Sequence, residues 1–188
     1  MIKRIVLLIL AIALTFSLLS CSGADNEALM VELPGLIQEG RELLDIVYGK
    51  GLTTDAERAE SIREGYVCVS ENAPYQSTGE LKVAFAKVFS KEYETVLYMT
   101  ALNNITYEGG DISPRYLESK EGLLFVDSSY ESQILEREPL YNSIKIIKSN
   151  RFMAEIEITM IYNDGREEAE TFVVVNEDGK WKLDSSVL

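Results

Sequence analysis

The stretch FMAEIEITM, residues 152–160, decides the fold, because apolar and polar side chains alternate along it. Alternation with a period of two is typical of a strand in an antiparallel sheet that has one buried face and one solvated face. The residues expected on the buried face are Phe152, Ala154, Ile156, Ile158 and Met160, and those expected in water are Glu155, Glu157 and Thr159.

Turn signals on both sides of this stretch extend the sheet. Asn-Asp-Gly at 163–165 is a hairpin signal, and Glu-Asp-Gly at 177–179 predicts a second turn. These turns and the apolar runs around them predict a meander of strands over 115–118, 123–127 with a turn at Gly122, 141–147, 172–175 and 181–183.

The first half of the chain has the period of helices. From about Glu27 to Tyr48 apolar residues recur at steps of three and four, and Gly49 and Gly51 end the pattern. Pro34 lies inside, which leaves open that the regular helix begins there and that the earlier residues form a separate turn. The apolar face comprises Leu29, Leu33, Leu36, Ile37, Leu43, Leu44 and Val47.

Three capping patterns predict further helices. Thr54 with Glu57 predicts a short helix over 55–64, and Ser77 with Glu80 predicts a longer one. Ser90 is expected to cap the next helix. The inner residues of the last two are expected to be Leu81, Ala84, Phe85, Val88 and Phe89, then Tyr93, Val96, Leu97, Thr100 and Ala101. Helices followed by a meander predict an α+β domain, with N-terminal helices packed on a curved, mainly antiparallel C-terminal sheet.

The N-terminus carries an export pattern. Lys3 and Arg4 precede an apolar run from Ile5 to Leu19, which is shorter than the roughly 20 residues that a membrane-spanning helix needs. Leu-Leu-Ser-Cys at 18–21 resembles the lipobox of bacterial lipoproteins, in which the cysteine is diacylated and the preceding bond is cut. We therefore expect a signal peptide over 1–20, lipidated Cys21 with a short tether over 21–27, and one domain over 28–188 at the extracytoplasmic face of the cell membrane.

The acidic composition restricts the classes of partner that the protein can bind. The chain has 18 basic and 31 acidic residues and a net charge of −13. Removal of residues 1–20 takes away two basic residues and no acidic one, so 16 basic and 31 acidic residues leave −15. Nucleic acid and lipid headgroups are bound through basic patches, so we expect no nucleic-acid partner. The acidity favours solubility, or else steering toward a basic partner.

Cysteine and histidine usage restrict the chemistry. Acylation of Cys21 leaves Cys68 alone, and its place in a predicted strand at 66–69 favours a buried thiol. The chain has no histidine. This excludes the serine and cysteine triads and histidine-ligated zinc. No phosphate loop or calcium loop is present, so we expect no catalytic residue, no metal and no cofactor. A pair of carboxylates for glycoside hydrolysis stays open.

The segment from Gly109 to Tyr130 is the candidate partner-binding region, because it joins the helical half to the sheet half. Arg and Tyr are common in interface hot spots. Its candidate residues are Asp111, Arg115, Tyr116, Glu118 and Tyr130. The alternative is structural, with Tyr116 packed against the helices and Arg115 paired with Glu118.

The order of features from Tyr66 to Leu188 resembles the IseA-type DL-endopeptidase inhibitor family and its clostridial lipoprotein relatives. The stretches that carry the resemblance are 75–81 (YQSTGEL), 88–93 (VFSKEY), 114–118 (PRYLE), the turn at Gly122 and 176–184 (NEDGKWKLD). The ending also occurs in nuclear-transport-factor-2-like and cystatin-like folds. No inhibitory residue can be carried over from a matching short motif.

The resemblance implies an inhibitor that occupies the cleft of a cell-wall peptidase which cuts peptidoglycan stem peptides. The alternative is a small-ligand-binding or enzymatic domain with an apolar pocket inside the curved sheet, lined by aromatic residues and one or two buried carboxylates. A purely structural lipoprotein is the third hypothesis.

Overall fold

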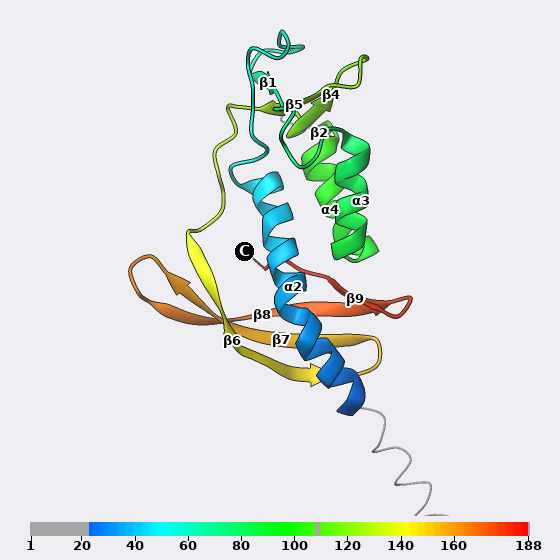
Figure 1. Ribbon diagram of the computed structural model, residues 1–188, viewed down its shortest axis with the longest axis vertical. Coiled ribbons are helices and arrows are strands. Elements are labelled where there is room, and N and C mark those ends of the chain that lie inside the picture. Colours follow the sequence, from blue (N-terminus) through cyan, green and yellow to red (C-terminus); the bar gives the residue numbers. More distant parts are fainter. Residues whose placement is uncertain (1–22, 108–109, 188) are drawn as a thin grey trace, which may run out of the picture.

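The computed structural model describes residues 23–107 and 110–187, without the side chains of residues 23–25 and 105–112 (Figure 1). Its first element is the long helix α2, Gly23–Tyr48. This helix starts four residues before the predicted Glu27 and runs through Pro34 without a break, so the alternative of a helix beginning at Pro34 is wrong. Leu29 and Leu33 are both fully buried, and a continuous helix places them on the same face as Ile37.

Two shorter helices follow, α3 (Thr78–Val88) and α4 (Lys91–Leu102), and both begin at the predicted caps. The Ser77 hydroxyl accepts a hydrogen bond from the Glu80 N–H at 3.1 Å, and the Ser90 hydroxyl accepts one from the Tyr93 N–H at 3.1 Å. Ser90 also donates to the Asp184 carboxylate, which ties α4 to the end of the sheet. Val96, expected inside, is 47% exposed.

The predicted helix over 55–64 is wrong, because these residues form turns and bends that follow a bridge at Thr54. Thr54 pairs with Val69 as an isolated antiparallel bridge, and the Asp55 N–H donates to the Cys68 carbonyl at 2.9 Å. The Asp55 carboxylate accepts from the Glu57 N–H at 3.0 Å. A helix here would carry only two alanines and an isoleucine as its apolar face, which gives too little apolar area to hold it on the core.

The C-terminal half is a four-stranded antiparallel sheet in the order β6-β7-β8-β9. Asp178 and Gly179 both have positive φ, as the turn between the last two strands requires. Phe152, predicted to start the buried face, precedes β7 in the turn and is 60% exposed. The strands are β6 Arg137–Ser149, β7 Met153–Tyr162, β8 Glu167–Glu177 and β9 Lys180–Leu183.

Two smaller sheets lie at the other end of the molecule. One, called here the small sheet, has three antiparallel strands in the order β1-β5-β4. The predicted Gly122 turn, at φ +82°, lies between β4 and β5. The other pairs β2 with β3. Gly110 and Asp111 belong to β3. The bounds are β1 Tyr66–Cys68, β2 Ile105–Tyr107, β3 Gly110–Ile112, β4 Tyr116–Glu118 and β5 Leu124–Asp127.

The helices α2, α3 and α4 lie on one face of the four-stranded sheet (Figure 1). One buried cluster joins α2, α3, α4, the inner face of that sheet and residues of the small sheet, including Tyr116, Leu124 and Val126. Cys68 is fully buried on the opposite side of the small sheet, as predicted, against Tyr66 and Phe125. The α+β class, with helices first and an antiparallel C-terminal sheet, is confirmed.

Candidate functional site

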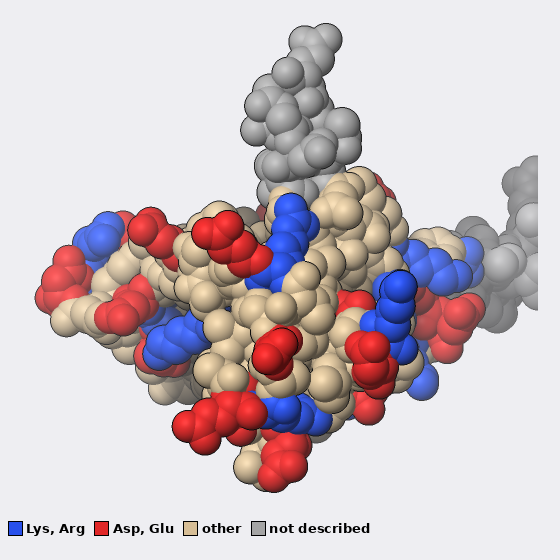
Figure 2. Space-filling model, turned by 90° about the horizontal axis from the view of Figure 1, so that it is seen from above, with Lys and Arg blue, Asp and Glu red and all other residues tan. Residues whose placement is uncertain are grey.

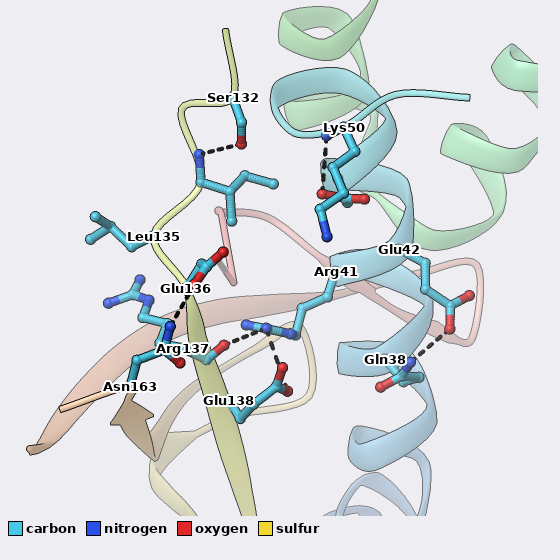
Figure 3. Close-up of a pocket in the computed structure, with 12 residues that line it drawn as sticks. Gln38, Arg41, Glu42, Lys50, Ser132, Leu135, Glu136, Arg137, Glu138 and Asn163 are labelled. Carbon is cyan, nitrogen blue, oxygen red and sulfur yellow. Dashed lines mark hydrogen bonds and ion pairs between the residues drawn. The ribbon is translucent and has the colours of Figure 1, made fainter. Parts of the chain in front are cut away.

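A polar cleft of about 640 Å³ lies beside the C-terminal half of α2 and is called here the α2 cleft (Figure 3). One wall is the polar face of α2. The other is the linker segment, residues 128–136, which joins β5 to β6, together with the start of β6. The lining residues are Gln38, Arg41, Glu42, Asp45, Lys50, Ser132, Ile134, Leu135, Glu136, Arg137, Glu138 and Asn163.

Both walls follow from local structure. Gln38, Arg41, Glu42 and Asp45 are spaced by three and four residues, so they share one face of α2, opposite its apolar face. The linker segment is held beside the end of the helix by the Gln133 N–H, which donates to the free Tyr48 carbonyl at 2.8 Å. The cleft is therefore fixed by backbone contacts at its upper end.

Arg41 forms the base of the cleft. Its guanidinium donates to the Arg137 carbonyl at 2.7 Å and to the Val187 carbonyl at 3.4 Å, and it lies 3.8 Å from a Glu138 carboxylate oxygen. These contacts come from β6 and from the C-terminal segment, so Arg41 joins three parts of the chain. The side chain is 16% exposed, so its position is set before any partner binds.

Lys50 supplies an exposed cation in the cleft. Its backbone N–H donates to Asp45 at 3.3 Å, while its ammonium group has no ion pair or hydrogen bond to any residue that the structure describes. Figure 3 shows Lys50 and Arg41 extending into the same space between α2 and the linker segment. An unpaired ammonium group in a concave site can pair with a partner's carboxylate.

Carboxylates and an apolar side chain complete the lining. Glu42, Asp45 and Glu138 also line the cleft, and the Glu136 carboxylate accepts from the Asn163 amide at 2.5 Å. Leu135 is 60% exposed. A lining of both charge signs with an exposed apolar residue fits a polypeptide segment better than a single-charge ligand.

Arg137 borders the cleft but acts as a structural group. Its side chain, 9% exposed, pairs with Glu170 and donates to the Tyr162 hydroxyl at 2.8 Å. The Arg137 Nε atom is buried without a hydrogen-bond partner. These contacts fix the start of β6 against β7 and β8, and so fix the wall that carries Glu136 and Glu138.

Arg115, a predicted partner-binding residue, is 4% exposed. Its guanidinium donates to the Asp127 carbonyl at 2.5 Å and to the Gly49 carbonyl at 3.2 Å, and it stacks 4.3 Å from the centre of the Tyr130 ring. It does not pair with Glu118 as the structural alternative expected. In this arrangement Arg115 and the half-buried Tyr130 fasten the small sheet to the end of α2.

Tyr116, the second predicted residue, is 1% exposed. Its hydroxyl donates to the Ile46 carbonyl at 2.9 Å and accepts from the Leu52 N–H at 3.0 Å. Burial raises the pKa of this hydroxyl to about 12, so it stays protonated. The packing against the helices that the structural alternative expected is present.

Glu118 and Asp111 lie away from this group. Glu118 is exposed and accepts hydrogen bonds from the Thr78 N–H at 2.9 Å and the Thr78 hydroxyl at 2.6 Å, which lower the pKa of its carboxyl. Asp111 stands opposite Thr106 in the β2–β3 pair, and its side chain lies outside the described residues. The structure thus gathers Arg115, Tyr116 and Tyr130 and leaves Glu118 at the start of α3.

The α2 cleft was not predicted from the sequence. The only signal for one wall was the polar spacing of Gln38, Arg41, Glu42 and Asp45, which is also typical of any solvated helix face. The second wall comes from a segment about 90 residues further along the chain, whose position no local pattern gives.

The face of the molecule seen in Figure 2 carries acidic and basic side chains interspersed, with no broad basic area on it. Within the part of the chain that the structure describes, no group of three or more Asp, Glu, His or Cys residues could hold a metal ion. The buried polar side chains among these residues are Ser90 and Arg115, so none is a carboxylate.

The space between α2 and the four-stranded sheet is filled. Its inner residues, such as Ile156, Met160 and Val174, are at most 2% exposed. The cavity found there measures about 10 Å³ and borders Ile37, Ile158 and Phe172. That volume holds one water molecule at most. A ligand pocket inside the sheet therefore has no space in this structure.

The predicted lipidation site, Cys21, and the signal peptide over 1–20 lie outside the described residues. Among the described helices, none has a stretch long and apolar enough to cross a membrane. Comparison with models of known protein families gives no match, and no curated protein matches the sequence. The likeness to the IseA-type inhibitors therefore stays a prediction.

Proposed function

We propose that the protein is a lipoprotein anchored through Cys21 at the extracytoplasmic face of the cell membrane, and that its domain binds another protein through the α2 cleft. The anchor rests on the export pattern at 3–19 and on the lipobox at 18–21. Two acyl chains on one cysteine give stable membrane attachment, where a single chain is marginal.

The observation that carries the binding proposal is the α2 cleft itself. It is about 640 Å³ in volume, which suits a segment of several residues, and its lining is preformed through Arg41 and Gln133. A preformed site avoids the entropic cost of ordering its own side chains when the partner binds. Lys50 and Leu135 offer a free charge and a free apolar contact.

The partner we propose is a cell-wall D,L-endopeptidase, whose activity the protein would inhibit. This part rests on the sequence resemblance, whose stretches fall at the starts of α3 and α4, at β4 and at the β8–β9 turn. An inhibitor needs a rigid surface and no chemistry of its own, which suits a chain without histidine.

The test is digestion of purified peptidoglycan by a D,L-endopeptidase in the presence of the acylated protein. We expect the protein to slow release of stem-peptide fragments. The Lys50→Glu variant should weaken inhibition by about tenfold, because it places a carboxylate where a partner's carboxylate would bind.

The matched control is Lys180→Glu, which reverses the charge of the exposed lysine that begins β9, a residue that does not line the cleft. It should inhibit as well as the parent protein does. Equal weakening by both variants would show a general charge effect and would exclude the cleft as the binding site. Failure of the parent protein to slow any of the endopeptidases of its own cell envelope would exclude the inhibitor function.

A further inference from the structure

The start of α2 and the turn between β6 and β7 lie at the same end of the molecule. Two contacts give the relative direction of the helix and the strand. Arg41 contacts the start of β6 at the Arg137 carbonyl, and Gln38 accepts a hydrogen bond from the Tyr141 hydroxyl at 2.8 Å. The helix α2 and the strand β6 are therefore antiparallel, so the start of α2 lies at the same end as the end of β6 and the turn at 150–152 (Figure 1).

This turn carries a basic segment in an acidic protein. The 16 residues 139–154 contain no Asp or Glu and include Lys145, Lys148 and Arg151, whereas the whole chain has a net charge of −13. Lys145 pairs with Glu157 at 3.2 Å. Glu155 stands opposite Lys148 in the β6–β7 pair, but among the described residues no carboxylate forms an ion pair with Lys148 or Arg151, so both cations can contact an anionic surface.

The same turn exposes an aromatic ring. Phe152 is 60% exposed and Met153 is 38% exposed. The Arg151 guanidinium lies 4.3 Å from the centre of the Phe152 ring. The backbone there is fixed, because the Phe152 N–H donates to Asn150 at 2.8 Å and the Phe152 carbonyl accepts from the Asn176 N–H at 2.7 Å. A rigid turn thus presents an apolar ring beside a cation.

An apolar ring with adjacent cations is the composition that settles at the boundary between lipid headgroups and acyl chains. The anchor proposed above, on which this inference rests, places Cys21 two residues before α2. Two residues span at most about 7 Å, so the start of α2 would lie at the bilayer surface. Glu27 and Glu32 on the helix are acidic, so the attraction to anionic lipids is confined to the turn.

We propose that the β6–β7 turn is a second contact with the membrane, in which Phe152 enters the lipid interface and Arg151 and Lys148 contact anionic headgroups. Two contacts fix the orientation of the domain, where a lipid anchor alone would let it rotate. The far end of α2 then stands at most roughly 40 Å from the bilayer, which is the length of its 26 residues at 1.5 Å per residue. The α2 cleft would face the cell wall.

The test uses the acylated protein that begins at Cys21, in vesicles of phosphatidylglycerol and phosphatidylcholine, with and without brominated acyl chains. Bromine on the acyl chains quenches tryptophan fluorescence only when the indole ring lies at the depth of those chains. Two variants, Phe152→Trp and Leu135→Trp, each place a tryptophan at a position that is 60% exposed. The parent protein, with Trp181 as its one tryptophan, supplies the background.

We expect brominated lipid to reduce the added emission of Phe152→Trp by about twofold and to leave that of Leu135→Trp unchanged. Adding Lys148→Glu and Arg151→Glu to Phe152→Trp should remove the quenching. Equal emission of Phe152→Trp with and without bromine, in protein that floats with the vesicles and carries diacylglyceryl Cys21, overturns the second contact and leaves the anchor standing. Absence of acyl chains on Cys21 overturns both.

Discussion

Among single residues, Glu118 is an exposed carboxylate that forms hydrogen bonds to another element of the fold. Its two hydrogen bonds come from the backbone and side chain of Thr78, the first residue of α3. A carboxylate at that position also lies at the positive end of the helix dipole. Glu118 therefore connects β4 to α3, and its charge contributes to stability.

The pH dependence of stability follows from the direction of this pKa. Thr78 holds the Glu118 pKa below its unfolded value, so the stabilisation is present at neutral pH and is lost as pH falls through the folded-state pKa. Glu118→Gln should lower the free energy of unfolding at pH 7 by about 0.5 kcal/mol, allowing for solvent screening of an exposed group. Urea titrations at pH 7 and near pH 3 should show the gap closing in acid.

Glu121→Gln is the control, because Glu121 is exposed in the neighbouring turn and its carboxylate forms no hydrogen bond or ion pair with any described residue. It should match the parent at both pH values. A Glu118→Gln variant that stays less stable by the same amount in acid would contradict the assignment, since the protonated parent no longer has the charge.

The candidate residues also show what residue spacing predicts and what it does not. Arg115 and Glu118 are three apart, an odd spacing, so in an extended chain they point to opposite sides. The strand predicted over 115–118 is therefore incompatible with an ion pair between Arg115 and Glu118. The actual partners of Arg115 are the carbonyls of Gly49 and Asp127, and backbone carbonyls leave no trace in a sequence.

Among the elements, α2 determines the positions of the others, since it contacts α3, α4, β6 and β9. Its apolar spacing predicted its face correctly, while Pro34 suggested a later start that burial of Leu29 and Leu33 overrides. The Thr54–Glu57 pattern, by contrast, predicted a helix over 55–64 that does not form. A capping pattern is a local signal, and without an apolar face behind it, the backbone of Thr54 bridges to Val69 instead.

Two glycines of α2 make a matched pair for stability. A Cβ added at Gly35 meets no atom within 4 Å, whereas one at Gly40 overlaps Leu183 Cδ1 in β9. Gly35→Ala should raise the free energy of unfolding by about 0.5–1 kcal/mol through helix propensity. Gly40→Ala should lower it by about 1–3 kcal/mol, because Leu183 or the helix must move.

Chemical denaturation of the two variants beside the parent protein measures both effects. Each variant serves as the control of the other, since both make the same substitution in the same helix. Stabilisation by both would mean that α2 does not pack against β9 as closely as described, and destabilisation by both would mean that Gly35 is not free of neighbours.

At the scale of the whole molecule, the two main sheets make no strand pair with each other, yet they share one core. Tyr116 from the small sheet and Leu183 from the large one both belong to the cluster that contains α2. The alternating pattern at 152–160 predicted the large sheet, but no pattern indicated that the small sheet packs over the opposite end of α2. That arrangement depends on the Tyr116 hydroxyl and the Arg115 guanidinium, which join segments more than 60 residues apart.

A shared core implies that both sheets unfold in one cooperative transition. The protein contains a natural probe in each sheet: Cys68 in β1 is fully buried, and Trp181 in β9 is half-buried against the core. In urea, reactivity of the Cys68 thiol and emission of Trp181 should change at the same midpoint. Tyr116→Phe leaves the Leu52 N–H without its partner. It should lower the free energy of unfolding by about 1–3 kcal/mol and shift both urea midpoints down together. If Cys68 reacts at a lower urea concentration than that at which Trp181 responds, the small sheet opens independently, and Tyr116 and Arg115 do not couple it to the rest of the fold.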